Sequence, residues 1–150
     1  MVIAVDTNIM LRLLEPGHPH CQTAIDAITH LTTNAAESFC TFPHCLHEVY
    51  HVLTREKNGH AKKPSQAIVE LNGLMASFPS QSDSDRLLAT WLALVGKYDI
   101  TGRLAYDAKI VAALIDHRIP TLLSFNDADF RRFTEITVIN PFDVLGRVRV

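Results

Sequence analysis

The chain has little of what marks secreted, membrane-bound or polyanion-binding proteins. Its three cysteines (Cys21, Cys40 and Cys45) include no CxxC pair, which argues against a disulfide framework or a zinc knuckle and is typical of a reducing cytoplasm. No apolar run approaches the ~20 residues that span a membrane. The first residues, MVIAVDTN, lack the basic leader of a signal peptide. We therefore expect a cytoplasmic protein without a membrane segment.

Excess positive charge is absent as well. The formal net charge is −2, so any phosphate-bearing partner must be met by a local basic patch or by bound cations. A length of 150 residues and a hydrophobic fraction of 47% suit one globular domain that spans residues 1–150.

Short apolar runs alternate with helical patterns along the chain. Strands are expected at residues 2–5, 38–42, 121–125 and 136–139. Helices are expected at 9–14, 21–31, from 43 onwards, and at 64–75, 85–97 and 107–117. Asn58-Gly59 interrupts a polar loop between two of them. This alternation predicts an α/β fold with three layers, α/β/α, around a central, mostly parallel sheet of about four to five strands.

Acidic residues recur where a predicted strand ends and the next helix begins. Asp6 follows the first strand, Glu48 lies early in the helix after the second strand, and Asp107 begins a helix. Asp127 and Asp129 follow the strand at 121–125. In open parallel sheets these positions lie along one edge, where ligands bind. Residues far apart in the sequence are therefore expected to converge there.

Each acid taken alone has a simpler interpretation. Asp6 and Asp107 are favoured as helix caps, and Asp127 and Asp129 are common in turns. Glu48 is harder to explain, because it shares a helix with an apolar stripe and a buried carboxylate needs a partner. Several carboxylates at one edge would repel each other unless a cation neutralised them. Oxygen ligands suit Mg²⁺ or Mn²⁺, which can activate water and stabilise the charge of a phosphodiester under attack.

Four segments resemble, in order, the motifs of PIN-domain ribonucleases. They are residues 3–8 (IAVDTN), 48–55 (EVYHVLTR), 107–113 (DAKIVAA) and 123–130 (LSFNDADF). Residues 136–141 resemble the closing strand of the same family, so the match in order and spacing covers nearly the whole chain.

The resemblance implies a PIN-like fold and Mg²⁺-dependent endoribonuclease activity. Many single-domain bacterial relatives are VapC-type toxins that a small antitoxin holds inactive. The catalytic and metal-binding acids carried over are Asp6, Glu48, Asp107 and Asp129, with Asp127 as the alternative fourth acid. The polar residues expected to support the metal or the phosphate are Thr7, Asn8, Ser124 and Asn126. The implied partners are an RNA substrate, an antitoxin and a second copy of the chain.

A competing motif overlaps the second of these segments. Residues 47–51 read HEVYH, and H-E-x-x-H on a helix presents two imidazoles to Zn²⁺ with the glutamate as general base of a metalloprotease. A catalytic zinc needs a third protein ligand. Glu70 is a possible distant ligand, but no recognisable motif surrounds it. His44, His47, His51 and His60 are otherwise read as surface or groove residues. A catalytically silent binding module that keeps the fold is the other alternative.

Basic and apolar clusters leave further questions open. Lys57, Lys62 and Lys63 read as a solvated loop or as a contact with the RNA backbone. Arg12, Arg103 and Lys109 lie near the acidic motifs and are candidates for phosphate contacts. Leu88, Trp91 and Leu92 are expected in the core, whereas an apolar groove among the early helices would suit an antitoxin helix or a dimer interface.

Overall fold

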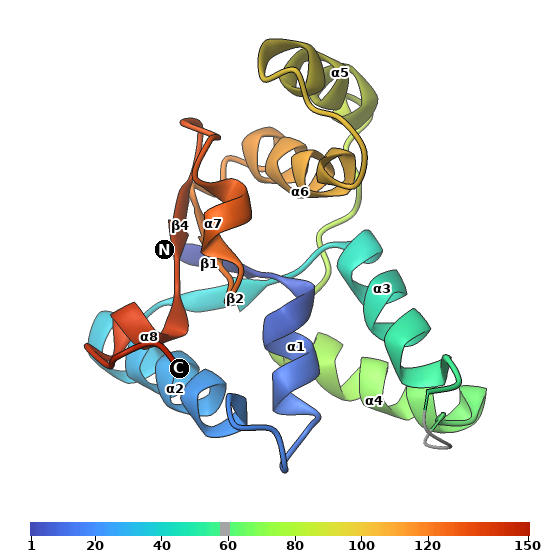
Figure 1. Ribbon diagram of the computed structural model, residues 1–150, viewed down its shortest axis with the longest axis vertical. Coiled ribbons are helices and arrows are strands. Elements are labelled where there is room, and N and C mark those ends of the chain that lie inside the picture. Colours follow the sequence, from blue (N-terminus) through green and yellow to red (C-terminus); the bar gives the residue numbers. More distant parts are fainter. Residues whose placement is uncertain (58–60) are drawn as a thin grey trace.

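The computed structural model in Figure 1 describes residues 1–57 and 61–150, so the predicted break at Asn58-Gly59 and the surface position of His60 lie outside the described residues. The strands are β1 (Val2–Val5), β2 (Ser38–Cys40), β3 (Thr121–Leu123) and β4 (Thr137–Ile139). The helices are α1 (Thr7–Leu13), α2 (Cys21–Ala35), α3 (Pro43–Thr54), α4 (Pro64–Ser77), α5 (Leu87–Lys97), α6 (Leu104–Asp116), α7 (Asp127–Phe130) and α8 (Pro141–Val144).

The four strands form one parallel sheet in the order β2-β1-β3-β4. Ala4 of β1 pairs with Cys40 on one side and with Leu122 on the other. A strand in this central place is covered on both faces, and Ala4 and Val5 are accordingly completely buried. The observed fold confirms the predicted α/β architecture, with a sheet that is wholly parallel.

Helices cover both faces of the sheet, as Figure 1 shows, with the α5–α6 pair on one side and α1 to α4 on the other. The sequence of α6 supplies a run of buried apolar residues, from Ile110 to Leu114, which explains its position against the sheet. None of the helices within the described ranges is both long and apolar enough to cross a membrane.

Two expectations drawn from periodicity are wrong. Helix α6 begins at Leu104 and not at Asp107, because the left-handed Gly102 (φ 62°) ends the preceding loop three residues earlier than expected. Asp107 is therefore inside the first turn and does not cap the helix. Leu88 and Leu92 are 67% and 55% exposed, since α5 is apolar on more than one face and buries Leu87 and Leu94 instead.

Candidate active site

Seven of the eight predicted site residues line a single cleft of about 630 Å³. They are Asp6, Thr7, Asn8, Glu48, Asp107, Asn126 and Asp129. The eighth, Ser124, lies completely buried behind Asp6 and binds its carboxylate. The carboxyl ends of β1 and β3 and the first turns of α1 and α6 meet here, as expected for a parallel sheet.

Asp6 is both a helix cap and the centre of this cleft. Its extended backbone ends β1, and its Oδ1 accepts a 2.7 Å hydrogen bond from the Thr7 amide at the start of α1. Its own amide donates to the Leu123 carbonyl at 3.0 Å, which ties the end of β1 to β3. The two interpretations of Asp6 are therefore compatible, because one oxygen caps the helix while the other takes part in a second network.

That second network joins the β1 and β3 ends. Ser124 Oγ and Asn8 Nδ2 donate to Asp6 Oδ2 at 2.7 and 3.0 Å. Asn8 Oδ1 in turn accepts from the Phe125 amide, and Ser124 Oγ accepts from the Asn126 amide, both at 3.0 Å. The arrangement holds the Asp6 side chain in one orientation.

The other three acids come from three different helices. Glu48, on α3, accepts a 2.8 Å hydrogen bond from Thr7 Oγ1 at its Oε2. Glu48 is exposed, not buried as its apolar neighbours suggested, because it faces the open side of the cleft. Asp107, on α6, is half-buried, and Asp129, on α7, is exposed at the cleft wall.

Burial and neighbouring negative charges raise the pKa of two of these acids. The pKa of Asp6 is raised to about 6. Burial is the largest cause, and the negative charge of Glu48 raises the pKa further. The pKa of Asp107 is also raised to about 6, first by burial and then by the negative charges of Asp6, Asp129 and Glu48. Asp6 and Asp107, whose ionised forms are disfavoured here, share the cleft with two further carboxylates, so a cation bound among the four would be stabilising.

The donor set fits a hard divalent cation. The four acids of the cleft offer carboxylate oxygens, and Mg²⁺ is usually held by one or two carboxylates with water filling its remaining positions. Within residues 1–57 and 61–150, no group of three or more His, Cys, Asp or Glu side chains is arranged closely enough to hold a metal ion.

Asp127 has a different environment from Asp129, although only one residue separates them. It is 6% exposed and accepts hydrogen bonds from Asn140 (3.0 Å), Arg131 (2.6 Å) and Arg149 (2.9 Å). Burial raises its pKa, but these donors outweigh burial and leave the pKa below its usual value. Asp127 therefore joins α7 to the C-terminal segment, while Asp129 faces the cleft.

Basic side chains and one histidine also line the cleft. Arg103 and Lys109 line the cleft, whereas Arg12 lies in an adjoining recess. His44, which the sequence indicated as a surface or groove residue without a role in the site, also lines the cleft, and its pKa is lowered to about 4, first by burial and then by the charge of Lys109. Its position directly after Pro43, at the start of a helix that follows a strand, was the signal that could have placed it at the site.

The H-E-x-x-H motif divides between two environments. Glu48 enters the cleft, whereas His47 and His51 are exposed on α3 and do not line it. Glu70, the candidate third ligand, forms an ion pair with Lys62 and lines a separate groove. No third zinc ligand accompanies the two imidazoles among the described residues.

The PIN domain family matches residues 3–136, and the chain belongs to this family. A comparison with curated protein sequences found no match.

Solved structures show the same fold at low sequence identity. A chain of VapBC2 from Rickettsia felis, bound to a promoter DNA fragment, has a TM-score of 0.70 at 16% identity, covering 93% of this chain and 98% of its own. A chain of a toxin–antitoxin complex from Klebsiella pneumoniae has a TM-score of 0.65 at 21% identity, covering 93% of this chain and 97% of its own. VapC20 from Mycobacterium tuberculosis, a Sarcin-Ricin loop cleaving toxin, has a TM-score of 0.61 at 20% identity, covering 87% of this chain and 95% of its own.

Proposed function

We propose that the chain is a Mg²⁺-dependent endoribonuclease and the toxin of a type II toxin–antitoxin pair, acting in the cytoplasm. One observation carries the proposal. Four carboxylates from separate elements converge on one cleft, where burial and mutual repulsion raise the pKa of Asp6 and Asp107 to about 6. Membership of the PIN domain family and the toxins among the structural neighbours support it.

The proposed ligands are Asp6, Glu48, Asp107 and Asp129, with Mg²⁺ or Mn²⁺ as the ion. When bound, such an ion supplies an activated water and neutralises charge on the scissile phosphodiester. Thr7 orients Glu48, and Ser124 and Asn8 orient Asp6, through the hydrogen bonds described above. Ligands held in this way lose little freedom when the cation and the substrate bind.

Arg103 and Lys109 are the proposed phosphate contacts of the cleft itself. Both come from the start of α6, as Asp107 does, and both line the cleft, so their positive charges attract a phosphodiester bound there. Lys109 is only loosely paired with Asp83, at 4.0 Å, which leaves its ammonium group available to an anionic substrate.

An antitoxin segment is the proposed occupant of a second groove, of about 700 Å³, between α2 and α4. Its apolar walls include Leu14, Ile28, Phe39 and Leu74, the pattern that receives the apolar face of a helix. A homodimer is proposed at a different place, where the exposed Leu88 of α5 and Tyr106 of α6 line one apolar groove and Leu92, also exposed, lies further along α5. An exposed apolar patch of this kind marks a protein interface.

The decisive experiment is cleavage of total RNA by the purified protein with Mg²⁺, with EDTA, and with Asp6→Asn. We expect EDTA to abolish cleavage and Asp6→Asn to reduce it by about 100-fold or more, since even the loss of an outer-shell partner of a ligand costs 10–100-fold. Wild-type protein that binds RNA without Mg²⁺-dependent cleavage would instead identify a silent binding module.

The motif at residues 47–51 supplies the control. His47→Ala removes an imidazole that zinc chemistry requires and that the cleft does not include. We expect RNA cleavage by this variant to equal that of the wild type. Expression of the wild type without its antitoxin should arrest bacterial growth, and expression of Asp6→Asn should not.

A further inference from the structure

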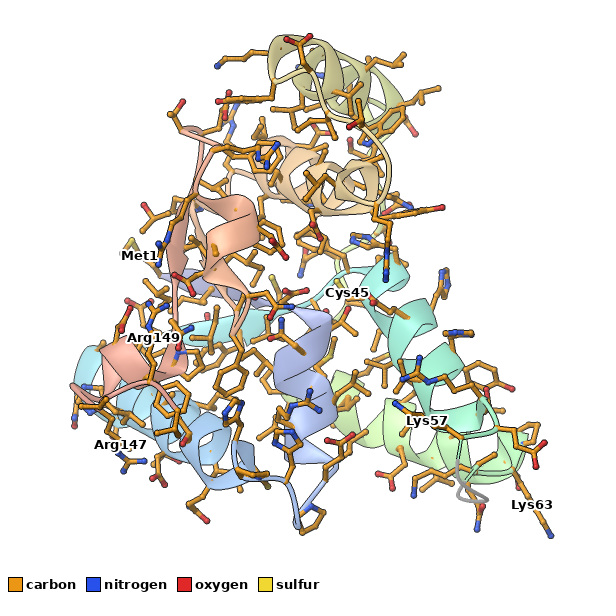
Figure 2. All side chains as sticks on the ribbon, viewed as in Figure 1. Met1, Cys45, Lys57, Lys63, Arg147 and Arg149 are labelled. Carbon is orange, nitrogen blue, oxygen red and sulfur yellow. The ribbon has the colours of Figure 1, made fainter. Side chains whose placement is uncertain are left out.

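A small recess of about 280 Å³ adjoins the acidic cleft. Asn8 and Asn126 line both, so they form the shared wall across which a bound chain would pass from one to the other. The recess lies beyond the metal-binding acids, on the side of α8 and the C-terminal segment, where Figure 2 labels Arg149.

Aromatic rings make up much of the recess. His20 stacks on Phe125 with ring centroids 4.9 Å apart and packs edge-on against Phe142 at 5.2 Å. His18 packs against His20 at 5.1 Å, and its Nδ1 accepts a 3.0 Å hydrogen bond from the His20 amide. Rings fixed in this manner need no further ordering to accept a nucleobase, and base–aromatic stacking is the common mode of single-stranded RNA binding.

The charged side chains that line the cleft and the recess differ. The cleft contains four carboxylates, whereas the side chains that line the recess include no Asp or Glu but include Arg12 and Arg149. Arg12 is paired with Glu15 at 2.6 Å, and Arg149 is paired with both Asp127 (2.9 Å) and Asp143, so acids behind the recess hold both guanidinium groups in place. An RNA strand needs cationic side chains wherever its phosphates are not neutralised by a metal ion.

We propose that this recess binds a nucleotide flanking the scissile phosphate of single-stranded RNA, with its base against His20 and Phe125 and its phosphate near Arg12 and Arg149. The proposal rests on the proposed ribonuclease function and adds a substrate-positioning site to it. A nucleotide held here sets which phosphodiester lies over Asp6, so the recess contributes to the choice of cleavage site.

The test is binding of a fluorescein-labelled, mixed-sequence single-stranded RNA to the cleavage-silent Asp107→Asn protein, measured by anisotropy at several salt concentrations. His20→Ala is expected to weaken binding about tenfold through lost stacking. His20→Phe, which keeps an aromatic ring, should restore most of the affinity. Arg12→Ala should weaken binding and reduce the slope of log K against log salt by about 0.7, the value of one phosphate contact on a single strand.

Matched controls remove the same side chains elsewhere. His30→Ala alters an exposed histidine on α2 whose ring hydrogen-bonds Asn34, and Arg86→Ala alters an exposed arginine at the start of α5 that lines neither the cleft nor the recess. Neither is expected to change RNA binding. In the catalytically intact background, His20→Ala should raise KM about tenfold with kcat within about twofold, whereas general loss of structure would lower kcat and the melting temperature together.

The outcomes separate this proposal from the proposed function. If the wild type cleaves RNA but His20→Ala and Arg12→Ala bind RNA as tightly as their controls, the proposed role of the recess is overturned and the proposed ribonuclease function stands. Recess-dependent binding without any Mg²⁺-dependent cleavage would support the recess and overturn the ribonuclease. Absence of RNA binding in the Asp107→Asn protein and of cleavage in the wild type would overturn both.

Discussion

Ser124 Oγ donates a 2.7 Å hydrogen bond to Asp6 Oδ2, although 118 residues separate the two in sequence. The bond spans the ends of the neighbouring strands β1 and β3, and Ser124 is completely inaccessible to solvent. A buried hydroxyl that orients a candidate metal ligand has a role in both folding and binding, and the two roles can be measured separately.

Ser124→Ala removes this donor and also the acceptor of the Asn126 amide. We expect the free energy of unfolding to fall by about 1–3 kcal/mol, the cost of leaving buried polar groups unpaired. Affinity for Mn²⁺ should fall about tenfold or more, because Asp6 loses the partner that orients it. Calorimetric titration and thermal unfolding measure the two effects. Ser65→Ala, at an exposed site on α4, should change stability by less than about 0.5 kcal/mol, and unchanged Mn²⁺ affinity in Ser124→Ala would refute the orienting role.

The raised pKa of Asp107 leads to a prediction about how the stability of the metal-free protein depends on pH. Its pKa is about 6 in the folded state against 3.8 for the ordinary carboxyl, so the folded state holds the proton more tightly than the unfolded state. The stabilisation that the folded state gains from a protonated Asp107 is therefore complete below about pH 4 and is lost as the pH rises through about 6. Asp107→Asn should remove this loss and be more stable than the wild type at pH 7.5, by about 1 kcal/mol after allowance for solvent screening of a half-exposed group.

Adding Mg²⁺ should make the wild type more stable than Asp107→Asn, the reverse of the order expected without metal. The wild type gains stability by mass action when its acids bind the cation, whereas Asp107→Asn lacks one ligand and gains less. Melting curves at pH 4 and 7.5, with Mg²⁺ and with EDTA, test both statements. A wild type that is more stable than Asp107→Asn at pH 7.5 in EDTA would contradict the repulsion inferred among the cleft acids.

Asp127 and Asp129 should respond oppositely to substitution by Asn. Asp127→Asn weakens hydrogen bonds to Arg131 and Arg149 and is expected to destabilise the fold by about 1–3 kcal/mol while metal affinity is retained. Because the pKa of Asp127 is depressed, its contribution is present above about pH 4 and is lost as the pH falls below that value. Asp129→Asn should lower Mn²⁺ affinity and RNA cleavage with little change in melting temperature, and the reverse pattern would make Asp127 the fourth acid.

The exposed leucines of α5 lead to a prediction about assembly. Leu88→Glu places a charge in the apolar patch and should convert a dimer into a monomer, as measured by size-exclusion chromatography with light scattering. Val69→Glu, at a 71% exposed position on α4, is the matched control and should leave the mass unchanged. A wild type that elutes as a monomer at high concentration would exclude the proposed interface.

Local patterns in the sequence accounted for most elements and for the composition of the cleft. The sequence predicted that Asp6, Glu48 and Asp107 lie along one edge of the sheet, and they line one cleft there. The prediction was possible because the carboxyl ends of parallel strands, and the helices that follow them, share that edge. Periodicity failed at Leu88 and Leu92, since a helix that is apolar on several faces does not reveal which face its neighbour covers.

The sequence by itself determined the strand–helix alternation, the parallel sheet and the set of acids at its edge, because these depend on local hydrophobic periodicity and on the geometry common to all such sheets. Only the tertiary structure decided that Asp129 and not Asp127 faces the cleft, that Ser124 binds Asp6, and that His20 and Phe125 meet beside Asn126. Side-chain directions of that kind arise from packing between elements far apart in the chain, for which the sequence carries no local signal.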